Sequence, residues 1–131
     1  MIRYLDTSAA LKLVIAEPES VALADELNRS VDRGDDLVAS MLLFTELHCA
    51  AQRRHQLSIS AVNAVVDRLT LFDLTRADLL RAATSAWGLR SADAIHLAAA
   101  LRIQADDLIT YDRELTATAA QAGLRTSRPG A

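Results

Sequence analysis

Short apolar runs that alternate with helical stretches constrain the fold of this chain more than any other feature. Extended runs are predicted at residues 2–5, 37–39, 70–74, 107–110 and 124–126. Between them, apolar residues recur at helical spacing, which predicts helices at residues 9–16, 21–31, 41–55, 59–69, 76–87, 91–104 and 113–122. Buried strands separated by helices are typical of a parallel sheet with helices on both faces. We therefore expect an α/β fold with a mainly parallel sheet of four or five strands.

Glycine and hydroxyl residues set the predicted boundaries of these helices. Gly88 and Gly123 each follow a helical run and are expected to end it, since glycine readily adopts the left-handed conformation of a helix C-terminus. Ser40 and Ser91 precede helical runs and are expected to cap them. The segment Gln56-Leu57-Ser58 is expected to turn the chain between two helices.

Bulk properties narrow the class of protein. A chain of 131 residues with 51% hydrophobic residues is expected to form one globular domain, residues 1–131. No apolar run approaches the roughly 20 residues of a membrane span, and Asp6 and Lys12 interrupt what would be the apolar core of a signal peptide. The single cysteine, Cys49, suits a reducing cytoplasm and is predicted to be buried. The net charge of −3 gives no overall basic surface for nucleic acid.

Two aspartates directly follow predicted strands. Asp6 ends the N-terminal strand, and Asp112 comes two residues after the strand at 107–110. In parallel sheets the carboxyl ends of the strands share one edge, where ligands bind in open α/β folds. For Asp6 and Asp112, however, a helix cap is the simpler interpretation. Thr7 and Ser8 admit the same two readings, as caps or as hydrogen-bond donors to the acids.

Two further acids lie on predicted helices. Glu46 has only apolar residues three and four positions away, which places its carboxylate toward the interior, where an unpaired charge is unfavourable by several kcal/mol. Arg53 is the nearest candidate partner in sequence, and a metal or catalytic site is the other explanation. Asp93 lies in the first turn of its helix, where the helix dipole alone favours an acid.

Taken together, the four acids predict a metal site at the carboxyl edge of the sheet. Neighbouring strands lie about 4.8 Å apart, which brings side chains at their ends within reach of a common ion. Clustered carboxylates repel one another unless a cation is present. Because the ligands are oxygen atoms, the set favours a hard cation, Mg²⁺ or Mn²⁺. Such an ion can activate water and stabilise charge on a phosphate.

The ordered set of motifs resembles the PIN domain, and the chain length resembles its VapC-type ribonuclease toxins. The motifs are Asp6-Thr7-Ser8 after the first strand, a helical Glu46, Ser91-Ala92-Asp93-Ala94 and Thr110-Tyr111-Asp112. The resemblance implies a PIN-like three-layer α/β/α sandwich and an Mg²⁺- or Mn²⁺-dependent endoribonuclease that cuts RNA. It assigns Asp6, Glu46, Asp93 and Asp112 as catalytic metal ligands, with Thr110 supporting them.

The same resemblance implies partners that the residues alone do not indicate. A small antitoxin encoded alongside would block the cleft, and the toxin would form a homodimer. Arg90 and Arg113 flank Asp93 and Asp112 and are the better candidates for phosphate contact, ahead of Arg53 and Arg54. His96, three residues after Asp93, is expected to serve in packing.

Two other functions remain open at this point. A phosphotransfer module, such as a receiver-like domain or an aspartyl-phosphate phosphatase, would also place an aspartate after a strand. Asp6-Thr7-Ser8 lacks the second aspartate of an Asp-x-Asp phosphatase loop, and Glu46 has no role there. A non-catalytic RNA-binding module would inhibit translation by occupancy alone. No Ser-His-Asp arrangement stands out, which argues against acyl transfer.

Overall fold

The computed structural model describes residues 1–55 and 57–131, so the turn expected at Gln56 lies outside the described residues. The strands are β1 (Ile2–Leu5), β2 (Asp36–Ser40), β3 (Thr70–Phe72), β4 (Asp107–Ile109) and β5 (Thr126–Ser127). The helices are α1 (Thr7–Val14), α2 (Ser20–Asp32), α3 (Met41–Arg53), α4 (Ile59–Val66), α5 (Arg76–Thr84), α6 (Ser91–Arg102) and α7 (Arg113–Gln121). The predicted alternation of strands and helices is confirmed.

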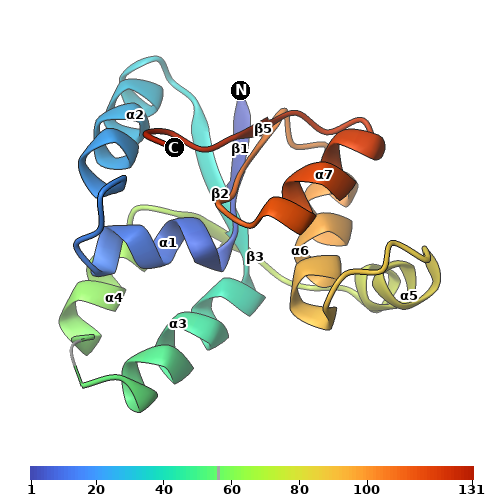
Figure 1. The fold of residues 1–131 in the computed structure, drawn as a ribbon, viewed down its shortest axis with the longest axis horizontal. Coiled ribbons are helices and arrows are strands. Elements are labelled where there is room, and N and C mark those ends of the chain that lie inside the picture. The colour runs from blue at the N-terminus through green and yellow to red at the C-terminus, as the bar shows by residue number, and fades with distance from the viewer. Residues whose placement is uncertain (56) are drawn as a thin grey trace.

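The five strands form one sheet in the order β3-β2-β1-β4-β5, and every pair of neighbours is parallel (Figure 1). The prediction of a mainly parallel sheet of four or five strands is therefore confirmed. The central strand is β1, and its two neighbours β2 and β4 lie far from it in sequence. In the register between β1 and β4, Leu5 lies beside Ile109. Because β1 and β4 both end there, Asp6 and Thr110 lie side by side.

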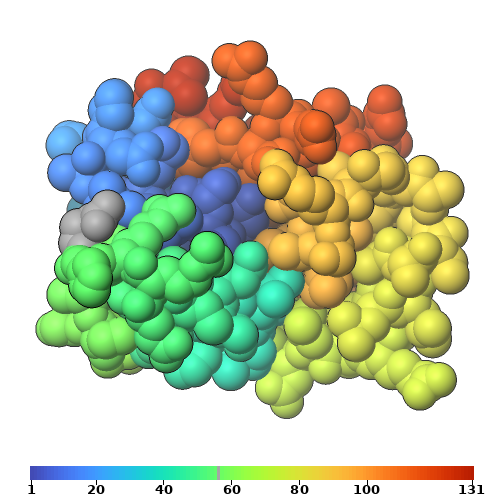
Figure 2. Space-filling model, turned by 60° about the horizontal axis from the view of Figure 1, so that its bottom comes forward, coloured from blue at the N-terminus to red at the C-terminus, as the bar shows by residue number. Residues whose placement is uncertain are grey.

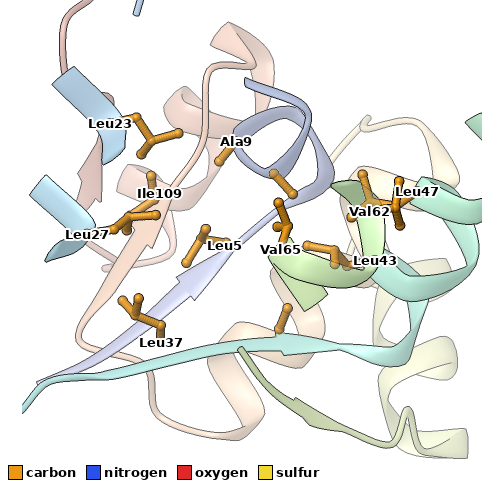
Figure 3. Packing of buried hydrophobic residues seen from close by; sticks show 12 residues of the cluster. Leu5, Ala9, Leu23, Leu27, Leu37, Leu43, Leu47, Val62, Val65 and Ile109 are labelled. Atoms are coloured by element: carbon orange, nitrogen blue, oxygen red, sulfur yellow. The ribbon is translucent and has the colours of Figure 1, made fainter. Parts of the chain in front are cut away.

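Helices α1 to α4 cover one face of the sheet (Figures 1 and 3). Their apolar stripes meet the alternate strand residues Leu5, Leu37, Ala39 and Ile109. The helices contribute Ala9, Ala10, Leu23, Leu27, Leu43, Leu47, Val62 and Val65 to the same cluster. Full burial of a leucine or valine side chain stabilises the fold by about 1.5–3 kcal/mol, so this cluster fixes how α1 and α3 approach the end of β1.

Helices α6 and α7 lie on the other side, against a second cluster, and α5 packs against α6 (Figure 1). Here the strands turn their other face, with Tyr4, Val38 and Leu108 as the buried residues. Helix α6 contributes Leu97, Ala99 and Ala100, and α7 contributes Leu115 and Ala119. The small alanine side chains let α6 pack close to the sheet, and the two covered faces confirm the expected three-layer α/β/α sandwich.

A buried ion pair at the amino end of the sheet joins β1 to β4. The guanidinium of Arg3 contacts the Asp107 carboxylate through Nε at 2.9 Å and Nη2 at 2.8 Å, and its Nη1 contacts Glu26 at 2.8 Å. The side chains of Arg3 and Asp107 are 4% and 0% exposed. Arg3 and Asp107 are also register partners. The pair therefore reinforces the alignment that sets Asp6 beside Thr110 at the opposite edge.

Several predicted boundaries were wrong by one to three residues. Helix α5 ends at Thr84 with Ser85 as its C-cap, because Ala86 already has a left-handed φ of 57°, so Gly88 is not the cap. Arg90, not Ser91, is the N-cap residue of α6. Strand β5 is Thr126–Ser127 instead of residues 124–126, since Leu124 turns into the core.

The prediction that Cys49 is buried was also wrong. Cys49 lies on the exposed side of α3, whose buried residues are Leu43 and Leu47. The apolar neighbours of Cys49 in sequence therefore do not share its face. None of the helices in the described residues is both long enough and apolar enough to cross a membrane.

Candidate active site

The carboxyl end of β1 delivers Asp6 into a hydrogen-bond network with the end of β4. Thr110 donates from Oγ1 to Asp6 Oδ2 at 2.6 Å, and Ser8 donates from Oγ to Asp6 Oδ1 at 2.7 Å. The backbone N–H of Ala9 also donates to Oδ1 at 3.0 Å, so Asp6 caps α1 as well. Asp6 is 1% exposed. Burial raises the pKa of its carboxyl group, and the donors from Thr110 and Ser8 only partly offset this.

Asp112 lies on the same edge, beyond the end of β4. Its backbone N–H donates to Thr110 Oγ1 at 3.1 Å, which ties it to the partner of Asp6. Its Oδ1 accepts from the N–H of Leu115 at 2.8 Å, so Asp112 caps α7. Ser8 Oγ accepts from the N–H of Tyr111 at 2.9 Å and completes the connection between the start of α1 and the start of α7. The cap and site interpretations of these acids are therefore compatible.

Asp93 enters from the first turn of α6 and is electrostatically coupled to the other two aspartates. Burial raises the pKa of its carboxyl group, and repulsion from Asp112 and Asp6 raises it further. His96 and Arg90 act in the opposite direction with smaller effect. Within the described residues no hydrogen bond to the Asp93 carboxylate is present. The ends of β1 and β4 and the first turn of α6 thus bring three aspartates close enough together to make ionisation of Asp93 less favourable.

Glu46 reaches the same edge from α3 and pairs with His96, not with Arg53. His96 Nε2 lies 2.7 Å from Glu46 Oε1, and Thr7 donates from Oγ1 to the same oxygen at 2.6 Å. Burial tends to raise the pKa of Glu46, but the hydrogen bonds from His96 and Thr7 outweigh it, and the pKa is lowered. The Glu46 side chain is 30% exposed, so it lies at the boundary of the interior instead of inside it.

Figure 2 shows this region from the carboxyl edge of the sheet. Atoms of the N-terminal segment, in dark blue, lie in a recess between the green segment of α3 and the gold segment of α6. Beside it, a cavity of about 360 Å³ is lined by Glu46, Cys49, Ala50, Arg53 and Arg54. This cavity reaches Glu46 and has Arg53 and Arg54 in its wall, whereas Asp6 is buried.

The family model described as PIN domain matches residues 3–121. This chain belongs to the PIN-domain family. The expectation drawn from its motifs is confirmed, and the acids at the sheet edge lie within the matched range.

Curated relatives of this PIN domain are named as ribonucleases. Ribonuclease VapC47 of Mycobacterium tuberculosis (strain CDC 1551 / Oshkosh) is 36% identical over 136 residues, covering 98% of this chain and 97% of the relative. Ribonuclease VapC35 of the same strain is 36% identical over 135 residues, covering 97% and 96%.

Solved structures share the fold at low sequence identity. VapBC2 from Rickettsia felis, bound to a promoter DNA fragment, matches with a TM-score of 0.79 and 15% identity, covering 98% of this chain and 99% of that one. VapC20 of Mycobacterium tuberculosis, described as a Sarcin-Ricin loop cleaving toxin, matches with a TM-score of 0.68 and 16% identity, covering 97% and 99%.

The acids of this PIN domain suit a hard cation by their chemistry but do not yet converge on a point. In the described part of the chain, no group of three or more histidine, cysteine or acidic side chains is placed to hold a metal ion. Asp6 and Glu46 are held by hydrogen bonds instead. The donor set is nevertheless all carboxylate, and the repulsion that raises the pKa of Asp93 is the kind that a bound cation relieves.

The predicted phosphate contacts Arg90 and Arg113 differ in their position. Both side chains are exposed. Arg90 lies close enough to Asp93 to counter the rise in its pKa. Arg113 lines a separate cavity of about 350 Å³ with Thr116, Ala117 and Arg128. Within the described residues, Arg90 is the one of the two whose charge affects the pKa of these acids.

Sequence reasoning missed three residues beneath the site. His96 was assigned to packing, yet its ring contacts Glu46. The Tyr4 hydroxyl lies 2.7 Å from His96 Nδ1 and 3.0 Å from Ser40 Oγ. Ser40 is the N-cap residue of α3, as predicted, but its side chain makes no capping hydrogen bond there. The available signal was polar atoms at buried positions: Tyr4 inside an apolar strand and His96 on the buried, alanine-rich face of α6.

Proposed function

We propose that this protein is a Mg²⁺- or Mn²⁺-dependent endoribonuclease and the toxin of a toxin–antitoxin pair that inhibits translation. The observation that carries the proposal is the placement of Asp93 at the carboxyl edge of the sheet, close enough to Asp112 and Asp6 for their charges to add to the effect of burial in raising its pKa. Structural ion pairs lower carboxyl pKa values, whereas repelling carboxylates in a recess are typical of a cation-dependent site. The ribonuclease names of the curated relatives support RNA as the substrate.

Asp6, Glu46, Asp93 and Asp112 would hold the ion. Thr110 and Ser8 keep the oxygens of Asp6 in place, and Thr7 does the same for Glu46. When bound, a divalent cation supplies polarisation of a water molecule and compensation of charge on the phosphate. The four carboxylates alone would repel the substrate, so the protein is expected to bind RNA productively only with the ion present.

The arginines beside Glu46 would receive the RNA backbone. Arg53 follows Glu46 by seven residues on α3, which places it about 10 Å further along the helix axis. Arg53 and Arg54 are exposed and have no acidic partner within the described residues, so their charge is available to phosphates. The cavity between these arginines and Glu46 would give the RNA strand a path into the site. Arg90, on the other flank, is the second contact.

A structural neighbour supports a protein partner for this chain. The matching structure from Klebsiella pneumoniae is a toxin–antitoxin complex. The protein is expected to bind a small cognate antitoxin that covers the acidic recess, to form a homodimer and to act in the cytoplasm, where its RNA substrate is found.

Cleavage of a labelled cellular RNA mixture with added Mn²⁺ tests the proposal. Hydrolysis assisted by these acids should leave a 5′-phosphate and a 3′-hydroxyl. Asp93→Asn should abolish cleavage, because it removes one ligand without changing side-chain size. Asp67→Asn, at the exposed C-cap of α4, is the matched control and should cleave like the unaltered protein.

Three outcomes would contradict the proposal. A 2′,3′-cyclic phosphate product would show attack by the ribose hydroxyl instead of water. Inhibition of translation that persists in Asp93→Asn would indicate an RNA-binding module that acts by occupancy. Stable labelling of Asp6 by acetyl phosphate would indicate a phosphotransfer module.

A further inference from the structure

A line of buried polar side chains runs beneath Glu46 and joins four elements. Glu46 on α3 contacts His96 on α6, with 2.7 Å between Oε1 and Nε2. His96 Nδ1 lies 2.7 Å from the hydroxyl of Tyr4 on β1, which lies 3.0 Å from Oγ of Ser40 at the end of β2. Tyr4 and Ser40 are 0% exposed and His96 is 1% exposed. The line therefore reaches from the site into the dry interior.

The hydrogen-bonding capacities of these groups determine which atom faces Glu46. The ionised carboxylate of Glu46 only accepts hydrogen bonds. Nε2 of His96 must then carry a hydrogen. In a neutral ring Nδ1 accepts a hydrogen bond from the hydroxyl of Tyr4. In a charged ring both nitrogens donate, and Tyr4 donates to Ser40. Either arrangement directs an N–H toward Glu46.

The two donors on Glu46 converge on one of its oxygens. Thr7 Oγ1 and His96 Nε2 both contact Oε1, at 2.6 Å and 2.7 Å. Within the described residues Oε2 has no hydrogen-bond partner. A glutamate side chain has several rotatable bonds, and fixing one oxygen with two donors removes most of that freedom. Oε2 is thereby left for an external ligand.

The tyrosine ring gives the line its rigidity. Tyr4 packs edge-on against His96, with ring centroids 5.7 Å apart, and against Phe72 at 6.0 Å. An imidazole held by an aromatic edge and by hydrogen bonds at both nitrogens has one orientation. Apolar side chains of the same shape would fill this space without desolvating any polar group. The polar side chains of His96, Tyr4 and Ser40 therefore serve to orient Glu46 more than to stabilise the fold.

On the basis of the proposed nuclease function, we propose that His96 is a positioning residue, backed by Tyr4 and Ser40, that holds Glu46 with Oε2 turned toward the ion. Such supporting groups orient a ligand before the ion arrives, and their loss typically reduces metal affinity or activity about 10–100-fold. His96 itself would contact neither the ion nor the RNA.

The two tyrosines of the chain provide a matched test. Tyr4→Phe removes the hydroxyl below His96 and keeps the ring. Tyr111→Phe removes a hydroxyl that donates to the carbonyl of Pro129, away from this line. We expect Tyr4→Phe to weaken Mn²⁺ binding, measured by electron paramagnetic resonance, about 10-fold and to lower kcat with KM unchanged. Tyr111→Phe should match the unaltered protein in both.

Substitutions at His96 test which atom matters. The amide nitrogen of His96→Gln can occupy the place of Nε2 and donate to Glu46, whereas His96→Leu can only fill the space. His96→Gln should therefore retain more Mn²⁺ affinity than His96→Leu, with circular dichroism confirming that each is folded. If His96→Leu does not fold, the comparison of Tyr4→Phe with Tyr111→Phe decides the matter.

Failure of this inference is distinguishable from failure of the proposed function. If the unaltered protein binds Mn²⁺, cleaves RNA and loses both in Asp93→Asn, the function holds. Equal Mn²⁺ affinity and equal kcat in Tyr4→Phe and Tyr111→Phe would then overturn the positioning role alone. If the unaltered protein neither binds Mn²⁺ nor cleaves RNA, the proposed function fails.

Discussion

Replacing Arg3 by methionine should destabilise the fold strongly while leaving the proposed site intact. Arg3 makes two contacts of 2.8–2.9 Å to Asp107, one to Glu26 at 2.8 Å and one to Ser30 at 3.3 Å. Without Arg3, the fully buried Asp107 carboxylate keeps the Ser127 hydroxyl at 2.9 Å and only the distant Arg125 at 3.6 Å. The hydroxyl carries no charge, and the Arg125 guanidinium, whose side chain is 60% exposed, compensates the carboxylate only in part.

The expected magnitude follows from this burial. Removing one partner of a buried ion pair usually lowers the free energy of unfolding by about 3–5 kcal/mol. At about 2.1 cal/mol/K per residue, the unfolding entropy of this chain is about 0.28 kcal/mol/K. The Tm of Arg3→Met should therefore fall by about 10–18 °C. Thermal and urea unfolding, followed by circular dichroism, measure both quantities.

The control and the rescue use neighbouring positions. The control variant Asp106→Asn changes an exposed aspartate. Among the described residues, the Asp106 carboxylate accepts a hydrogen bond only from the N–H of Ile2, so the variant should change the free energy of unfolding by less than about 1 kcal/mol. The double variant Arg3→Met/Asp107→Leu should recover most of the loss, since no charge is then buried. A loss below about 1 kcal/mol in Arg3→Met would refute the argument that this pair supports the register of β1 and β4. Well below its Tm, Arg3→Met should still cleave RNA.

Three further predictions concern the acidic edge and its flank. Asp93→Asn should resist urea better than the unaltered protein at pH 7. Folding raises the pKa of Asp93, so the unaltered protein loses stability as the pH rises and this carboxyl group ionises. The advantage of the variant should vanish at about pH 4, where Asp93 is largely protonated in both the folded and the unfolded state. Added Mn²⁺ should stabilise only the unaltered protein; the reverse pH trend would contradict the repulsion. Arg53→Ala and Arg54→Ala should each raise KM for RNA. Each should also reduce the slope of log binding constant against log salt concentration by about 0.7, whereas Arg76→Ala on α5 should leave both unchanged. Equal slopes in all three variants would exclude an RNA path along α3. Cys49 is exposed in the same cavity and should react readily with iodoacetamide, and bound RNA should protect it. If Cys49 reacts equally fast with and without RNA, the RNA strand binds elsewhere.

The predictable part of the site consists of residues whose position follows from local pattern. A short apolar strand followed closely by a helix places Asp6 at a sheet edge, and the same pattern places Asp112 there. The structure puts both on one edge because β1 and β4 are parallel neighbours. The Thr110 side chain, expected to support the acids, donates to Asp6. Their role as metal ligands stays a prediction.

Helix periodicity gave less certain results on α3. It predicted that Glu46 faces inward, and the side chain does turn toward the site, although 30% of it is exposed. The same reasoning wrongly buried Cys49. Periodicity identifies the buried stripe only to within one position, because a turn of 3.6 residues leaves the edges of the stripe ambiguous. Leu43 and Leu47 mark its centre.

The sequence by itself determined the alternating strands and helices, the acids that end the strands and the family to which the chain belongs, because these depend on neighbours a few residues apart. Only the tertiary structure decided that Glu46 pairs with His96 instead of Arg53, and that Tyr4 and Ser40 lie beneath them. Those contacts join residues 36 to 92 positions apart. Their existence depends on the order of the strands and on how closely α6 packs against the sheet, and no local pattern encodes either.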